Sequence, residues 1–306
     1  MHQPSPPTKA VPAPSKGRAD ARPALAFAAL IVANVALAFG PWFVRLADTG
    51  PVAAAFWRIA LAAPLLAGLA WSSGARPTRL APALVGALVI GGVCFAADLG
   101  SWHLGIRRTT LANATLFGNT ATLFYPLYGF LVARAWPTRM QGLALLLALA
   151  GGGLLIGRSY QLDASNVTGD LLCLAAGVLY TFYFIFMARA RAVMAPLPAL
   201  ALSTWASLLP LLGFAWLLGE RVWPSHWGAL IGLALFSQVF GQGLMIYALG
   251  RFSPLVVGLA LLVQPVVGAT IGWWVYGERL GAADLVGAAL VAAALVLVRE
   301  RRPAAT

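Results

Sequence analysis

Two charged side chains interrupt the long apolar runs of this sequence and are the first place to look for chemistry. Arg58 lies within FWRIALAAPLL, and Asp98 lies within FAADLGSWHLG. Counted from the ends of their runs at about 1.5 Å per helical residue, Arg58 lies about 10 Å deep and Asp98 about 12 Å deep. A charge at the centre of a bilayer costs about 2.5 to 3.5 kcal/mol on insertion scales, which disfavours an unpaired charge facing lipid. We therefore expect the two side chains to pair or to line one polar cavity.

These two charges have two interpretations that the sequence leaves open. In the first, Arg58 and Asp98 form an ion pair that only fixes helix packing, or Arg58 extends to the headgroups. In the second, Arg58 binds a substrate carboxylate or phosphate, and Asp98 is its resting counter-ion and a site of proton coupling. The second interpretation predicts a substrate that is acidic or zwitterionic.

Trp102 and His103 follow Asp98 along the same run. Trp102 lies one helical turn beyond Asp98, so it either lines the same pocket or anchors the helix at the headgroups. An ordinary histidine titrates near neutral pH, which makes His103 a second candidate for proton coupling, but a single interfacial histidine is more often simply hydrated.

Two amide side chains lie still deeper. Asn119 and Gln264 are each about ten residues into their runs, about 15 Å from either surface, and a shift of 145 residues superimposes one on the other. Amides at this depth either bind a substrate or hydrogen-bond to each other between helices. A second tier of polar candidates consists of Asn113, Gln238, Gln242 and Tyr247.

The elements that carry these residues are built for a bilayer. Of 306 residues, 60% are hydrophobic and 10% are charged, whereas about a quarter of the residues of a soluble domain are charged. Ten runs are long enough to cross about 30 Å of hydrocarbon, and only helices satisfy the backbone of runs of this length. The runs cover residues 24–44, 51–71, 80–102, 111–132, 140–157, 171–187, 197–218, 227–249, 254–276 and 282–298.

The ten runs divide into two similar halves. The shift of 145 residues aligns FAADLGSWHLG with FGQGLMIYALG, and Gly142 with Gly287. Because each half holds an odd number of spans, the second half enters the membrane in the opposite sense. The expected fold is an all-α membrane protein with ten transmembrane helices arranged as two inverted five-helix repeats, 24–157 and 168–298. This architecture is typical of secondary transporters.

The basic residues predict the orientation. With the N-terminus inside, cytoplasmic segments hold 14 of the 21 Lys and Arg residues and outer segments hold 6. This bias favours a protein of the inner membrane with both termini in the cytoplasm. Residues 1–23 are expected to form a disordered cytoplasmic tail, and residues 299–306 a cytoplasmic tail. The net charge of +12 then reflects the membrane topology of the chain. The expected partner is the lipid bilayer and not nucleic acid. The sequence leaves open whether the protein forms a homodimer.

Several segments resemble a known family. TTLANATLFGNTATLFYP, its counterpart SPLVVGLALLVQPVVGATIGWWVYGERLGAADLVGAALV, and Arg58 in FWRIALAAPLL are similar to the EamA-type members of the drug/metabolite transporter superfamily. The resemblance covers about residues 24–298. It implies a carrier that moves a small metabolite across the inner membrane by alternating access, with export favoured. The first half has Ala133-Arg134-Ala135 where the second has Gly277-Glu278-Arg279, so Glu278 is expected to shape a turn and not to touch substrate.

Other functions fit less well. Catalysis needs clustered His, Ser, Asp or Glu, but the chain has three histidines, and His2 and His226 fall outside the apolar runs. No phosphate-binding glycine loop follows a strand, so neither ATP nor another cofactor or metal is expected. A lipid or polyprenyl flippase is the main alternative, and an intramembrane enzyme is a more distant one.

Overall fold

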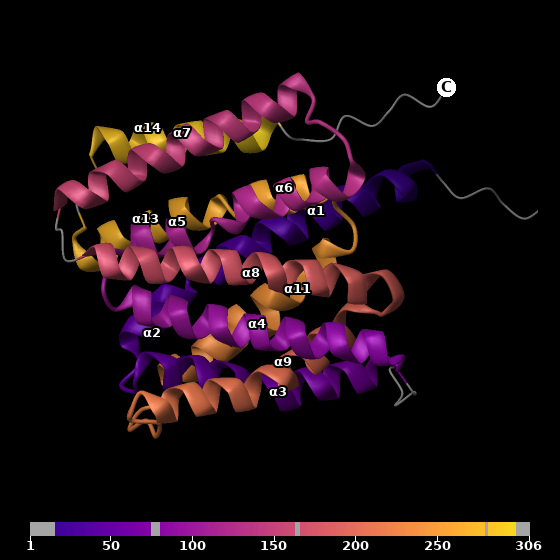
Figure 1. The fold of residues 1–306 in the computed structure, drawn as a ribbon, viewed down its shortest axis with the longest axis vertical. Helices are drawn as coiled ribbons and strands as arrows, with labels where there is room; N and C mark the ends of the chain where they lie inside the picture. Colours follow the sequence, from indigo (N-terminus) through magenta and orange to yellow (C-terminus); the bar gives the residue numbers. More distant parts are fainter. Residues whose placement is uncertain (1–15, 75–79, 163–165, 279–280, 298–306) are drawn as a thin grey trace, which may run out of the picture.

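The structure is a computed structural model that describes residues 16–74, 80–162, 166–278 and 281–297. Within these ranges every regular element is a helix, and the helices lie roughly side by side (Figure 1). The first half contains α1 (Lys16–Ala38), α2 (Gly40–Leu46), α3 (Pro51–Ser72), α4 (Pro82–Ile106), α5 (Leu111–Gly118), α6 (Ala121–Ala133) and α7 (Arg139–Leu162). The second half contains α8 (Val167–Val193), α9 (Pro196–Leu217), α10 (Gly228–Gly232), the π-helix η2 (Leu233–Gln242), α11 (Gly243–Leu249), α12 (Pro254–Ala260), α13 (Val263–Tyr276) and α14 (Ala282–Leu297).

Seven helical segments of the described chain are long and apolar enough to cross a membrane. They cover Pro23–Leu46, Pro51–Ser72, Pro82–Ile106, Val167–Val193, Pro196–Leu217, Gly228–Leu249 and Pro254–Tyr276. The all-helical membrane fold is therefore confirmed, whereas the predicted number of ten spans is not.

The difference arises in the fourth, fifth and tenth runs. The fourth run is divided into α5 and α6, which end at Gly118 and begin at Ala121, and it is not among the segments found long and apolar enough to cross. In the fifth run only Arg139–Gly151 counts as a short apolar helix. The tenth run ends at Val298, outside the described residues.

The N-terminal segment also differs from the expectation. Helix α1 begins at Lys16, so residues 16–23 are helical although a disordered tail was predicted over 1–23. Ala, Arg and Lys, which predominate there, are favourable helix formers, and the helix simply extends beyond the apolar run. Residues 1–15 of the predicted tail, and all of 299–306, lie outside the described residues.

The two broken helices of the chain lie against each other. Helix α5 contacts α13 while α6 contacts α12, which requires α5–α6 and α12–α13 to run antiparallel. Close packing at this contact depends on small residues: a Cβ on Gly258 would lie 2.9 Å from the ring of Pro126. Two further pairs of helices also join the first half to the second: α3 packs on α9, and α7 packs on α14 (Figure 1).

The helix ends define two faces of the bundle, which we name by their place relative to the N-terminus. The N-terminal face holds the starts of α1, α4 and α12 and the ends of α3, α6 and α8, on the right in Figure 1. The far face holds the starts of α3, α5 and α8 and the end of α13. Residues of both halves meet at each face.

Candidate functional site

A small cavity among buried side chains of the bundle brings together most of the polar residues that the sequence singled out. Both halves contribute, with Arg58 from α3, Asp98 from α4 and Gln242 from the end of η2. The free volume of the cavity is about 30 Å³, room for very few water molecules. Its lining consists of Leu37, Arg58, Phe95, Asp98, Leu99, Trp102, Gly118, Asn119, Tyr180, Gln242 and Gln264.

Arg58 is the largest fully buried side chain of the described residues, with 1% of its surface exposed. Its Nε donates to Oε1 of Gln238 at 3.1 Å, and its Cζ lies 5.9 Å from the ring centre of Phe95. Gln238 in turn donates from Nε2 to Oγ1 of Thr204 at 3.3 Å. Nη1 of Arg58 is buried and has no hydrogen-bond partner among the described residues. One side of the guanidinium is therefore held in place and the other keeps a free donor.

Asp98 lines the same cavity as Arg58 but does not form an ion pair with it. The ion pairs among the described residues are Arg45 with Glu278 and Asp48 with His226. Nor does Arg58 extend to the headgroups, since it is buried. Arg58 and Asp98 thus line one cavity without an ion pair between them.

The two symmetry-related amides meet as well. Nδ2 of Asn119 donates to Oε1 of Gln264 at 3.2 Å and to the Thr115 carbonyl at 2.6 Å. Nε2 of Gln264 donates to Oδ1 of Asn34 at 2.9 Å. Asn119 and Gln264 therefore bond to each other and also line the cavity. Asn34 was not predicted, although an isolated Asn in the apolar run ALIVANVALAFG was a signal that could have identified it.

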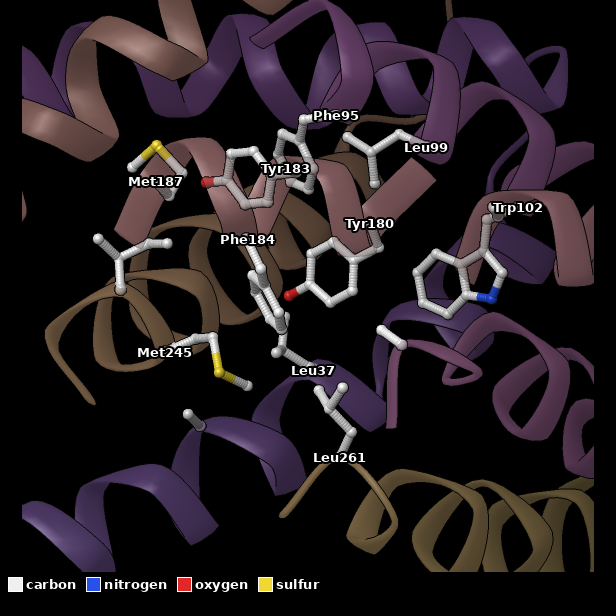
Figure 2. Close-up of a cluster of buried hydrophobic side chains, with 14 of the residues drawn as sticks. Leu37, Phe95, Leu99, Trp102, Tyr180, Tyr183, Phe184, Met187, Met245 and Leu261 are labelled. Atoms are coloured by element: carbon white, nitrogen blue, oxygen red, sulfur yellow. The ribbon is translucent and has the colours of Figure 1, made fainter. Parts of the chain in front are cut away.

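An aromatic wall completes the cavity on the side of α8. The Tyr180 hydroxyl donates to Oε1 of Gln242 at 3.1 Å. The rings of Phe95 and Tyr183 stack with centres 4.4 Å apart, and Tyr180 packs beside them (Figure 2). Nε2 of Gln242 and the hydroxyl of Tyr183 are buried without a hydrogen-bond partner among the described residues. Sequence reasoning missed both tyrosines, which look like ordinary core residues in the run VLYTFYFIF.

The π-helix η2 places Gln238 and Gln242 on one buried face, together with Ser237 and Gly241. A π-helix has i→i+5 hydrogen bonds and is rare, and short π segments within α-helices are frequently found at functional sites. The counterpart of η2 in the first half, 145 residues earlier, lies within the regular helix α4. The two halves are thus unlike each other where the cavity is built.

Three predicted site residues have surroundings that their positions in the sequence did not indicate. Trp102 is 8% exposed, donates from Nε1 to the Ala114 carbonyl at 2.8 Å and lines the cavity, so it is not an interfacial anchor. His103 is fully buried with Nδ1 3.0 Å from the Pro51 carbonyl oxygen, and it does not line the cavity.

Asn113 is the third, and it also lies outside the cavity lining. Its Nδ2 donates to Oγ1 of Thr109 and to Oδ1 of Asp170, each at 3.1 Å. The reason is distance along the helix: six residues before Asn119 correspond to about 9 Å, which moves Asn113 to the far face.

Side chains from both halves close the bundle at the far face. Nη1 of Arg45 lies 3.0 Å from Oε1 of Glu278, which also accepts from the Leu111 amide at 3.2 Å. Nη2 of Arg45 donates to the Thr109 carbonyl at 2.7 Å. Gly277 directly before Glu278 has φ +65°, a conformation that favours glycine. Glu278 therefore follows a turn, as expected, and in addition links the two halves.

A second link at the far face joins the loop after α2 to the loop after α9. Oδ2 of Asp48 accepts from the amides of Ser225 at 2.8 Å and His226 at 3.2 Å, and Oε2 of Glu220 accepts from the Ala53 amide at 2.8 Å. Desolvation works to raise the pKa of Asp48, but the backbone hydrogen bonds from Ser225 and His226 outweigh it and lower the pKa.

No group of three or more His, Cys, Asp and Glu side chains in the described ranges could hold a metal ion. A multi-pass bundle of apolar helices that encloses a cavity with buried opposite charges is the architecture of a membrane transporter. The profile of the EamA-like transporter family matches residues 24–157 and 167–299. The chain therefore belongs to the EamA-like transporter family, which confirms the resemblance seen in the sequence.

Two individual proteins are similar to this chain over most of its length. A protein of Archaeoglobus fulgidus named "Uncharacterized transporter" is 23% identical over 267 residues, which cover 85% of this chain and 91% of the relative. A solved crystal structure superimposes with a TM-score of 0.69 over 91% of this chain and 96% of that chain, at 15% identity. The second match shows the fold alone.

Proposed function

We propose that this protein is a secondary transporter that moves a small zwitterionic or anionic metabolite, such as an amino acid, across the inner membrane by alternating access. The observation that carries the proposal is Arg58, which is buried, positioned by Gln238 and left with an unpartnered Nη1 in the cavity that it shares with Asp98. The basic N-terminal face lies in the cytoplasm in this proposal, and export is the favoured direction.

The chemistry of the cavity supports a charged substrate. A buried donor without a partner costs about 1 to 3 kcal/mol, and more when it is charged. A carboxylate is the best partner for a guanidinium because its two oxygens match two parallel N–H groups. Asp98 supplies the opposite charge for an ammonium group, so a molecule that carries both groups complements both residues. The Gln242 amide, whose Nε2 is free, would add a donor.

The arrangement of the helices supports alternating access. With about 30 Å³ of free volume, the cavity admits a metabolite only when the bundle opens at one face. The antiparallel contact of α5–α6 with α12–α13 passes beside the cavity, and Asn119 and Gln264 bond across it. Rocking of one half against the other about this contact would expose the same residues first to one side and then to the other.

Asp98 is the better candidate for proton coupling in this scheme. A substrate carboxylate bound to Arg58 would compete with Asp98 for the positive charge, and a buried carboxylate that loses its compensation gains by taking up a proton. His103 is less suited, because it lies outside the cavity lining and its Nδ1 is engaged by the Pro51 carbonyl. The scheme works for a monomer and equally within a homodimer.

The test is transport by purified protein in liposomes, with uptake and efflux measured separately for amino acids, organic acids and nucleosides. We expect amino acids or organic acids to be transported, and Arg58→Gln and Asn119→Ala to reduce the rate by about tenfold or more. Asn113→Ala is the matched control, since it removes an amide six residues before Asn119, in α5 and outside the cavity lining. Transport of long-chain lipids instead would favour a flippase, and normal rates in both cavity variants would remove the site.

A further inference from the structure

A second hollow lies at the N-terminal face, apart from the cavity. It is a groove of about 1320 Å³ formed by the end of α3, the start of α4, the end of α8 and the start of α9. Ile90, Leu202 and Trp205 line it and have 40–51% of their surfaces exposed. Exposed large apolar side chains on membrane-spanning helices face lipid, so the groove is accessible from the bilayer.

Arg189 is the one charged residue among the described residues that line this groove. It lies in the last turns of α8, is exposed, and has its Cζ 5.7 Å from the ring centre of Phe186, which also lines the groove. No carboxylate within the described ranges forms an ion pair with it. The described lining of the groove thus combines apolar walls with the positive charge of Arg189 near the end of α8.

At the far face, the space that corresponds to this groove is filled by tryptophan side chains. A shift of 145 residues relates Leu202 to Trp57 and Pro82 to Trp227. At the far face the ring centre of Trp57 lies 4.8 Å from that of Trp227 and 5.2 Å from that of Trp223, and Trp57 Nε1 donates to the Val222 carbonyl at 2.7 Å. The smaller side chains at the N-terminal face leave the equivalent space open.

We propose that this groove binds an anionic phospholipid, with an acyl chain along its apolar walls and the phosphate at Arg189. The apolar walls alone would not select an occupant, because lipid chains are as apolar as the helices that they touch. The charge of Arg189 selects for a negative headgroup, at about 1 kcal/mol for a basic residue near an anionic surface. Because α3 and α4 belong to one half and α8 and α9 to the other, the bound lipid contacts both halves.

The test is native mass spectrometry of the full chain in mild detergent with added phosphatidylglycerol or phosphatidylcholine. Wild-type protein should retain phosphatidylglycerol about fivefold better than phosphatidylcholine, and Arg189→Gln should abolish this preference. Arg134→Gln is the matched control, an arginine that follows α6 at the same face and outside the groove lining. It should leave the preference intact.

A second variant tests the apolar walls of the groove independently of the charge of Arg189. Ile90→Trp adds bulk to the apolar wall of the groove, and it should reduce retention of both lipids while the thermal unfolding temperature stays unchanged. Equal retention of the two lipids by the wild type, an unaltered preference in Arg189→Gln, or an equal loss in Arg134→Gln would overturn the proposal. Dimers that Ile90→Trp dissociates would also overturn it, because a second copy of the chain would then cover the groove.

Discussion

The ion pair of Arg45 and Glu278 should control how often the far face opens. Its atoms are 3.0 Å apart, and the two side chains are 18% and 20% exposed. Exposed pairs contribute about 0 to 1 kcal/mol and hydrogen bonds to charged groups about 1.5 to 3 kcal/mol. Glu278→Gln keeps an acceptor for the Leu111 amide but removes the charge, so we expect a loss of about 1 to 2 kcal/mol. This corresponds to a shift of about 5- to 30-fold towards the open far face.

The assay is the labelling rate of a cysteine in the cavity by a membrane-impermeant maleimide added at the far face. Leu99→Cys supplies the thiol, in a background in which Cys94 and Cys173, both free, are replaced by alanine. Glu278→Gln should raise the rate by the same factor of about 5 to 30.

The control for this assay is His226→Gln. It removes the 91% exposed partner of Asp48 at the same face and should change the rate by less than about twofold. An unchanged rate in Glu278→Gln, or the same increase in His226→Gln, would refute the reasoning.

Three further predictions concern stability, each measured by thermal or denaturant unfolding in detergent. Gln238→Leu removes the partner of the Arg58 Nε and should cost about 1 to 3 kcal/mol. Gly258→Ala should cost a similar amount because its Cβ would crowd α6, whereas Gly68→Ala, with no neighbour within 4 Å, should be neutral or stabilising. The pKa of Asp48 is lowered in the folded protein. The ionised Asp48 therefore contributes fully to the free energy of unfolding above the ordinary aspartate pKa of 3.8, and this contribution is lost as the pH falls below that value. Asp48→Asn should remove this acid dependence of the stability.

The fold class and part of the cavity could be predicted from the sequence because both follow from the cost of placing polar groups in lipid. That cost makes Arg58 and Asp98 share an enclosed space, and the repeat brings Asn119 opposite Gln264. Composition and run length predicted an all-helical membrane fold, but they could not predict where a run breaks, as the fourth does at Asn119.

Other features depend on contacts that no local pattern reveals. The π-helix η2 has the same apolar character as an α-helix, so only its hydrogen bonds distinguish it. Arg45 and Glu278 are 233 residues apart, and nothing in either segment specifies the other as its partner. Asn113 has the same residue type as Asn119 and lies six residues before it, yet the distance along α5 places it with Asp170 instead of in the cavity.

The most direct test of the central claim is substrate protection of the Leu99→Cys thiol in right-side-out and inside-out vesicles. If the cavity is the substrate site of an alternating-access carrier, the thiol should react from both sides. A saturating concentration of a transported compound should then slow both reactions by about tenfold or more. Reaction from one side only, or rates that the transported compound leaves unchanged, would contradict the account.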